Sequence, residues 1–511
     1  MIATIKSATL LGIEGHPVTV EVHIGRGLPA FTVVGLPDAA CRESRDRVRA
    51  AFASSELEFP KTRVTVNLAP SGVRKIGAGL DLAIAVAILA AQGRIDGRVV
   101  EECAFLGELG LDGRVRAIAG VLSLVDALDT PAVAVPLECV NEASLVGRHL
   151  VRGVSSLRAA VAAIAGREPW PEPPFVGTAA AARPSVDPAG LIPDLAAVRG
   201  QPLGQWAVEV SAAGGHHLLM IGPPGAGKTM LAGCLPGLLP ALTRAEALEV
   251  TRIHSAGGLA LPHGGLVEQP PFRAPHHTAS MVSLVGGGTA LARPGEISFA
   301  CHGVLFMDEL AEFPPAVLDT LRQPIEEGWI RVSRARHTVT FPADFLLVAA
   351  MNPCPCGEGG AFGSCRCSDA VRNRYVRRVS GPLLDRFDLR VVVSRPDASD
   401  LLGAEPSEAS RIVAARVAAA RALAPTRGVC CNADLDADAL DRWAVLSSPS
   451  RRLIEHRLRA GRLSARGLQR VRRVARTLAD LAGDESGVLD ERHVAAALEL
   501  RADTAVLDVA S

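Results

Sequence analysis

One glycine-rich loop constrains the fold of this chain more than any other feature of its sequence. A short apolar run over residues 217–221 leads into Gly-Pro-Pro-Gly-Ala-Gly-Lys-Thr, and a helical pattern follows at once. Glycines at these positions let backbone N–H groups turn towards phosphate oxygens, and the start of a helix adds partial positive charge. The chain has only four lysines, and one of them lies in this loop: Lys6, Lys61, Lys75 and Lys228. A chance glycine loop would not need that context, so we predict a nucleoside-triphosphate site.

The expected ligands of this triphosphate, ATP, come from the loop itself. We expect Lys228 to neutralise the β- and γ-phosphates and the Thr229 hydroxyl to ligate Mg²⁺. The neighbouring residues complete the predicted nucleotide contacts: Gly222, Pro223, Pro224, Gly225, Ala226, Gly227 and Met230.

Two more apolar runs end in polar residues that suit the same chemistry. Residues 303–307 lead into Asp308 and Glu309, and a carboxylate pair at the end of a buried strand is costly unless it meets a metal or a polar ligand. We expect Asp308 to position Mg²⁺ and Glu309 to orient and deprotonate the attacking water. Residues 345–351 lead into Asn352, whose amide can bond both the γ-phosphate and that water. The plainer alternatives are a helix-capping Asp308 and a turn at Asn352.

The composition narrows the classes of function. Basic and acidic residues balance at 54 each, so binding of a polyanion by overall charge is excluded and any nucleic-acid contact must come from local patches. Aromatic residues make up 4% of the chain, which argues against many base-stacking platforms. The sequence starts without a charged leader and a long apolar core, and the longest apolar run, 82–91, is too short to span a bilayer. We therefore expect a cytoplasmic protein with no membrane partner.

A length of 511 residues predicts about three domains. In residues 1–168, β-like runs alternate with alanine-rich helical runs, which predicts an α/β or α+β domain. Prolines and small residues fill 169–190, and we interpret this stretch as a linker. Residues 191–400 alternate apolar strands with glycine-rich turns and helices, and the pattern of 401–511 is helical.

The three polar strand ends resemble those of the AAA+ ATPases, in the order Walker A, Walker B and sensor 1. Gly381-Pro-Leu-Leu-Asp-Arg386-Phe-Asp also looks like the arginine-finger segment of magnesium chelatase ATPase subunits and MCM helicases. That likeness implies that Arg386 reaches the nucleotide of a neighbouring subunit. Leu463-Ser-Ala-Arg466 opens a helical pattern that Ser464 can cap, and it resembles the sensor 2 segment of the same families. Arg386 and Arg466 would then grip one phosphate from different bodies; the alternative for each is a surface ion pair.

The whole chain resembles the ComM/YifB family of magnesium-chelatase-like proteins. The segments that carry this likeness are Thr251-Arg-Ile-His-Ser-Ala-Gly-Gly, Phe272-Arg-Ala-Pro-His-His-Thr-Ala-Ser, Pro294-Gly-Glu-Ile-Ser and Met351-Asn-Pro-Cys-Pro-Cys-Gly. The resemblance implies an α/β fold: an AAA+ core over 191–400 with an α-helical C-terminal lid over 401–511. It also implies a homo-hexamer that drives DNA branch migration in recombination and natural transformation.

Residues 1–168 resemble the C-terminal domain of Lon proteases, which has a ribosomal S5 domain 2-like α+β fold. Gly107-Glu-Leu-Gly-Leu-Asp-Gly-Arg-Val-Arg matches its strand pair. The protease would need a serine within 75–81 and a lysine after Gly120, and the sequence has neither. Acyl chemistry then lacks its nucleophile and its base, so we interpret the domain as a non-proteolytic platform for assembly or ligand binding.

Four of the eleven cysteines crowd into one short stretch: Cys354, Cys356, Cys365 and Cys367. Four thiolates can close a tetrahedral Zn²⁺ shell, which would be structural because no position remains for water. Reversible disulfides and four unliganded thiols are the alternatives.

Residues 331–341 alternate like a β-hairpin between the second and third predicted strands. A hairpin at this position enters the central pore of MCM- and chelatase-like proteins, so the likeness points to DNA contacts by its basic residues: Arg331, Arg334, Arg336 and His337. Residues 257–288 look like a second insert, and solvated loops are the alternative for both. Residues 451–476 hold ten arginines, which we divide between ATP, subunit and DNA contacts or a solvated helix face.

Three functions remain open at this stage. The first is a hexameric ATP-driven motor acting on branched or single-stranded DNA. The second is a remodelling ATPase like magnesium chelatase, acting on a protein partner. The third is a regulatory platform without motor activity, against which the intact loop and strand ends count.

Overall fold

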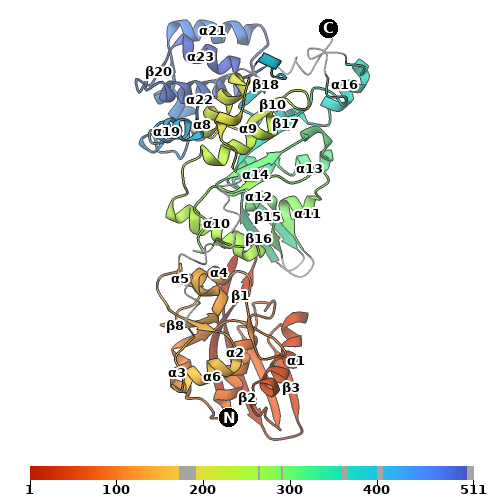
Figure 1. Ribbon diagram of the computed structural model, residues 1–511, viewed down its shortest axis with the longest axis vertical. Coiled ribbons are helices and arrows are strands. Elements are labelled where there is room, and N and C mark those ends of the chain that lie inside the picture. Colours follow the sequence, from red (N-terminus) through yellow and green to blue (C-terminus); the bar gives the residue numbers. More distant parts are fainter. Residues whose placement is uncertain are drawn as a thin grey trace.

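The computed structural model describes residues 1–171, 192–262, 265–288, 292–334, 337–358, 365–399 and 407–502. Figure 1 shows three parts that follow one another along the long axis: an N-terminal unit, a central unit built on a parallel sheet, and a group of C-terminal helices. Most of the predicted linker lies outside the described residues. Trp170 packs against the N-terminal core and under the Arg152 guanidinium, so the N-terminal unit extends past its predicted end at 168.

The N-terminal unit is a seven-stranded mixed sheet in the order β3-β4-β2-β1-β5-β8-β9. β1 pairs antiparallel with β2 and β2 with β4, whereas the remaining neighbours run parallel. The strands are Ile2–Leu11, Glu14–Gly25, Ala30–Val34, Arg63–Ala69, Cys103–Phe105, Ala132–Pro136 and Leu150–Val154 in the order β1 to β5, β8, β9; the predicted strand pair is β6 (Glu108–Leu109) with β7 (Val115–Arg116).

Helices cover this sheet where the sequence is apolar on one side or all round. The helices are α1 Ala39–Ser54, α2 Asp81–Ala91, α3 Gly97–Glu101, α4 Val121–Asp126, α5 Val140–Ser144 and α6 Leu157–Ile164. The longest apolar run of the chain forms α2, and nearly every residue of it is buried, because a helix that is apolar all round must lie within a core. Among the described residues, no helix is both long and apolar enough to cross a membrane.

The central unit is a parallel five-stranded sheet in the order β11-β14-β17-β10-β18. Its strands are β10 Leu218–Ile221, β11 Phe272–Arg273, β14 Val304–Met307, β17 Leu346–Met351 and β18 Leu389–Val392. The helices around it include α8 Pro202–Gly214, α9 Lys228–Cys234, α10 Arg244–Gly257, α11 Met281–Val285, α12 Glu296–Phe299, α13 Pro315–Asp319, α14 Arg322–Glu327, α16 Asp369–Val376 and α17 Gly381–Leu384. β11 lies within the stretch that we expected to be an insert, so part of that stretch is the outer strand of the sheet.

The predicted hairpin is present as β15 (Trp329–Arg334) paired antiparallel with β16 (His337–Pro342). Residues 335–336 lie outside the described residues, and with them the predicted DNA contact Arg336. The base of the hairpin packs on the N-terminal unit: a Cβ at Gly12 would lie 2.2 Å from Cγ1 of Val339.

The C-terminal part is helical, as predicted, with one short parallel strand pair, β19 (Val445–Leu446) and β20 (Val488–Leu489). Its helices are α19 Ser410–Arg421, α20 Ala437–Trp443, α21 Ser448–Arg459, α22 Ala465–Leu481 and α23 Glu491–Glu499, and they share a core with α8 and β10. Four of the ten arginines in 451–476 have partners inside this core region: Arg470, Arg472, Arg473 and Arg476. Our expectation of DNA contact or a solvated face is wrong for these four.

Candidate functional site: the carboxyl ends of the parallel strands

The glycine-rich loop leaves β10 and closes on the first turn of α9. Gly225 and Gly227 adopt left-handed backbone angles (φ 77° and 86°), which favour glycine. A Cβ at either position would meet nothing within 4 Å, so the space in front of the loop is open. Gly222 is required for another reason: a Cβ there would lie 2.0 Å from the carbonyl oxygen of Val393. The loop therefore has the curvature and the room that phosphate oxygens need.

Lys228 begins α9 and lies across this loop, with 8% of its surface exposed. Its ammonium donates to the carbonyls of Gly222 (2.6 Å) and Pro223 (2.9 Å) and to Oδ1 of Asn352 (3.2 Å). Burial lowers the pKa of Lys228, and the charges of Asp308 and Glu309 oppose that shift. A buried cation held only by neutral oxygens is poised to accept an anion.

Thr229 and Asp308 face each other across the strand ends. The Thr229 hydroxyl donates to Oδ2 of Asp308 over 3.0 Å. Octahedral Mg²⁺ has bonds of 2.0–2.1 Å, which place neighbouring ligand oxygens about 2.9 Å apart. A hydroxyl and a carboxylate oxygen at this separation match the hard oxygen ligands that Mg²⁺ prefers, so the residues present fit that ion.

Glu309 follows Asp308 in a left-handed backbone conformation (φ 51°), which is uncommon outside glycine. Its N–H donates to Oδ1 of Asp308 (2.9 Å), and its Oε2 lies 3.1 Å from Nδ1 of His277. The His277 ring also packs edge-on against Phe313. Sequence reasoning gave His277 no role, although it belongs to the quoted Pro-His-His-Thr segment; only the fold shows that it touches Glu309.

The predicted ligands meet in one cavity of about 410 Å³ at the carboxyl ends of β10, β14 and β17. Its described lining is Pro224, Gly225, Ala226, Gly227, Lys228, Thr229, Met230, Asp308, Glu309, Ala350, Met351 and Asn352. Carboxyl ends of parallel strands are the usual place for ligands in open α/β sheets. The structure thus brings together the residues of all three predicted strand ends.

The two predicted arginines are not in the described lining of this cavity. Arg386 lines a larger cavity of about 510 Å³ at the opposite, amino ends of the strands, and its side chain pairs with Glu326. Burial and the nearby charges of Arg470, Arg466 and Arg322 lower the pKa of Arg386, so Arg466 lies close to it. Our expectation that the two arginines act from different bodies is therefore wrong: one chain carries both on one side.

The helix of Arg466 otherwise follows the prediction. α22 begins at Ala465, and the Ser464 hydroxyl caps it by accepting the N–H of Gly467 (3.1 Å). Val471 and Ala475 are buried along its apolar face, and Arg466 is exposed in the first turn.

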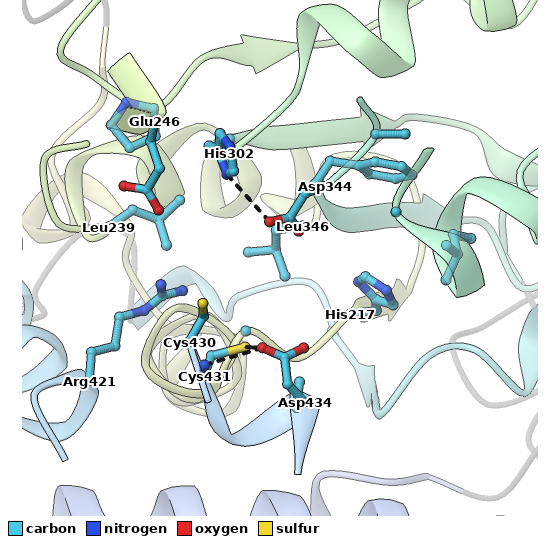
Figure 2. A pocket seen from close by; sticks show the side chains of 18 of the residues that line it. His217, Leu239, Glu246, His302, Asp344, Leu346, Arg421, Cys430, Cys431 and Asp434 are labelled. Carbon is cyan, nitrogen blue, oxygen red and sulfur yellow. Dashed lines mark hydrogen bonds and ion pairs between the residues drawn. The ribbon is translucent and has the colours of Figure 1, made fainter. Parts of the chain in front are cut away.

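Figure 2 shows part of the cavity at the amino ends, where His302 lies beside Asp344 on one wall and Cys431 beside Asp434 on another. His217, just before β10, accepts the N–H of Leu347 through Nδ1 (3.1 Å). Burial lowers the pKa of His217 to about 4, so this ring is a neutral acceptor. Sequence reasoning did not find this cavity, because its lining comes from segments more than two hundred residues apart.

The four clustered cysteines lie just beyond Asn352, and their sulfur atoms are all within 4.8 Å of one another. The N–H of Glu358 and the Cys354 thiol lower the pKa of Cys356 to about 6, so this sulfur is largely a thiolate at neutral pH. On the hairpin, the predicted DNA contact Arg331 is exposed and its guanidinium lies 4.7 Å from the Trp329 ring centroid.

The parallel sheet, the phosphate-binding loop and the carboxylate pair define an ATPase of the AAA+ class with a magnesium-chelatase-like core. Family models match along most of the chain: "Subunit ChlI of Mg-chelatase" over 20–135, "Magnesium chelatase, subunit ChlI" over 194–401 and "Magnesium chelatase, subunit ChlI C-terminal" over 407–501.

Three relatives are similar over nearly their full length. An uncharacterized protein of Mycobacterium tuberculosis is 45% identical over 502 residues, 97% of each chain. YifB of Escherichia coli is 41% identical and the competence protein ComM of Haemophilus influenzae 40% identical, each covering 98% of this chain and 97% of its own. The chain belongs to the YifB/ComM family of magnesium-chelatase-like proteins.

Proposed function

We propose that this protein hydrolyses ATP at the carboxyl ends of the parallel strands and uses the cycle to move DNA through a homo-hexamer. The observation that carries the proposal is the convergence of Lys228, Thr229, Asp308, Glu309 and Asn352 on one cavity. Each residue type there has a defined task in phosphoryl transfer, and no other chemistry needs all of them together.

In this proposal Lys228 exchanges its carbonyl partners for β- and γ-phosphate oxygens. Thr229 and Asp308 hold Mg²⁺, which would offset charge on the transferring phosphoryl group. Glu309 orients a water in line with the terminal phosphate and takes its proton. Asn352 offers its amide to the same phosphate. Arg386 and Arg466, which lie away from this cavity, complete the site of a neighbouring protomer.

The first experiment tests the nucleotide site by direct binding of a fluorescent ATP analogue. Lys228→Ala should weaken binding by roughly 100-fold, because two or more charge-assisted hydrogen bonds are lost. Lys61→Ala is the matched control, since Lys61 is 87% exposed and lies in the N-terminal unit. Equal binding by both variants would refute the assignment of the loop.

The DNA part of the proposal rests on the family likeness and on the hairpin β15–β16. Its exposed Arg331 is held over Trp329, so a cation is presented at a defined place. Forked or Holliday-type DNA should stimulate the ATPase, and added salt should reduce that stimulation steeply. Arg331→Ala should reduce stimulation several-fold, whereas Arg98→Ala, an exposed arginine of the N-terminal unit, should not. Flat ATPase across DNA structures would exclude a DNA motor.

We further propose that the N-terminal unit is a non-proteolytic, Lon-like platform docked on the ATPase. The segment after Gly120, where a protease would need its lysine, is occupied by this docking. Gly120 donates its N–H to the Ser255 hydroxyl (2.9 Å), and Leu122 donates to Glu142, which also accepts from Ser255. The Lys75 ammonium is fully buried and donates to the Pro70 carbonyl. A casein or peptide cleavage assay should show no activity.

A remodelling ATPase acting on a protein is the second candidate, because all three matching family models describe a magnesium chelatase subunit. Co-purification with a large porphyrin-binding protein, together with ATPase that ignores DNA, would favour it over the DNA motor.

A further inference from the structure

We infer that Cys354, Cys356, Cys365 and Cys367 form a structural zinc site that braces the phosphate-binding loop. Sulfur–sulfur distances carry the metal assignment. Cys354 Sγ lies 3.2 Å from Cys356 Sγ and 3.6 Å from Cys365 Sγ, and Cys356 and Cys365 are also 3.6 Å apart. Four Zn–S bonds of about 2.3 Å in a tetrahedron place the sulfurs about 3.8 Å apart.

The other occupants fit this arrangement less well. A disulfide needs a separation of about 2.05 Å, and none of these three pairs approaches it. Four sulfurs within 4.8 Å enclose room for one ion, whereas a cluster of several irons needs its ligands further apart. A tetrahedral four-sulfur set with a single ion selects zinc among the common divalent metals.

The cluster is built against the nucleotide loop. Gly357, one residue after the second cysteine, packs so closely on Pro224 that a Cβ there would lie 2.6 Å from Cδ of that proline. Arg395, beyond β18, donates to Glu358 (2.8 Å) and to the Pro224 carbonyl (3.4 Å). The segment between the cysteines and the sheet is therefore clamped to the loop from two sides.

The last cysteine connects the cluster to the strand end that carries the carboxylates. Cys367 lies two residues before α16, and Tyr375 of that helix is buried in the core of the sheet. Just after α16, Arg378 donates to the Ala311 carbonyl (3.1 Å) and to Glu312 (2.9 Å), three residues beyond Glu309 at most. One ion at the cysteines would thus fix the segments next to Pro224, Asn352 and Glu309 relative to one another.

The experiment measures metal content and nucleotide affinity on the full-length protein. Protein purified without chelator should contain about one zinc per chain by inductively coupled plasma mass spectrometry. Cys356→Ser should lose most of it, and Cys430→Ser, which changes an exposed cysteine in the cavity at the amino ends, should keep it. Titration of wild-type thiols with a mercurial should release the zinc to a chromogenic chelator, which tests the site without any variant.

The bracing role rests on the proposed ATP site and has its own readout. Zinc-free Cys356→Ser should bind the ATP analogue several-fold more weakly than Cys430→Ser, and equal affinities would overturn the bracing role. Lys228→Ala should lose nucleotide while keeping zinc, so failure of the ATP site and failure of the zinc site give different results. Absence of zinc, bound iron, or two disulfides in intact-mass spectra of freshly purified protein would each overturn the metal assignment.

Discussion

The two ends of the central sheet differ in how their charged groups are partnered. At the carboxyl ends, Lys228 is held by backbone carbonyls and an amide, and the carboxylates of Asp308 and Glu309 face an open cavity. At the amino ends, arginines already have acidic partners of their own chain: Arg386 pairs with Glu326, and Arg470 with Asp388 over 2.7 Å. The first end holds the groups that bind a phosphate, and the second holds those that would stabilise its transfer.

This difference explains why the proposed catalytic set is incomplete within one chain. Burial opposes ionisation of Asp388, but the hydrogen bond and charge of His216 and the charge of Arg470 hold its pKa below the ordinary value. An ion pair of this kind keeps the arginines of a single protomer in place. Assembly would then bring Arg386 to a neighbour's phosphate in exchange for Glu326, which is an exposed and weakly held partner.

The largest expected effect tests whether the two ends cooperate between protomers. Arg386→Ala should leave nucleotide binding intact and reduce ATPase by about 10³-fold or more, as the loss of an arginine finger does in GTPases. Mixing Arg386→Ala with Lys228→Ala should restore part of the activity, because mixed assemblies contain some interfaces with both residues intact. Mixtures no more active than the separate variants would place Arg386 outside a shared site.

The next effect concerns the carboxyl end alone. Glu309→Gln should bind the ATP analogue normally and lose about 10²–10⁴-fold in turnover, because the amide cannot take a proton from water. Glu312→Gln is the matched control, since Glu312 lies three residues on and pairs with Arg378 instead. Steady-state phosphate release measures both, and full turnover by Glu309→Gln would remove it as the base.

A smaller effect is expected from the residue that sequence reasoning missed. His277→Ala frees the Glu309 carboxylate from its only printed side-chain contact and should lower turnover by about 10-fold without weakening nucleotide binding. The control is His276→Ala, which changes the exposed neighbouring ring. His277→Asn should recover part of the loss, because an amide can still donate to Glu309. Equal behaviour of both alanine variants would make the contact incidental.

The smallest effect concerns stability at the amino ends. Burial lowers the pKa of His302, but its bonds to Asp344 (3.3 Å) and Glu249 (2.7 Å) outweigh burial and raise it to about 12. A raised pKa contributes stability that is complete below the unfolded value near 6.5 and is lost as pH rises towards 12.

Urea unfolding at pH 6 and pH 9 measures that contribution. Wild type should lose about 1–2 kcal/mol more between the two than His302→Asn, a substitution chosen because asparagine tolerates the left-handed backbone (φ 55°) at this position. Identical pH dependence in the two proteins would contradict the clamp.

The sequence by itself determined the nucleotide end of this protein. A loop that needs glycine at fixed positions, a lysine at its close and polar residues after apolar runs are local patterns, and parallel strands necessarily bring their carboxyl ends to one edge. The hairpin, the long buried helix α2 and the Ser464 cap were equally local and were predicted for that reason.

Only the tertiary structure decided how distant segments meet. It placed His277 on Glu309, Arg466 beside Arg386, and the cysteine cluster against Pro224. It also turned four arginines of 451–476 inward, because carbonyls and carboxylates from other helices offered them partners that no spacing along the chain reveals. Periodicity fixes which face of an element is apolar, but the contacts of a polar side chain depend on which element packs across from it.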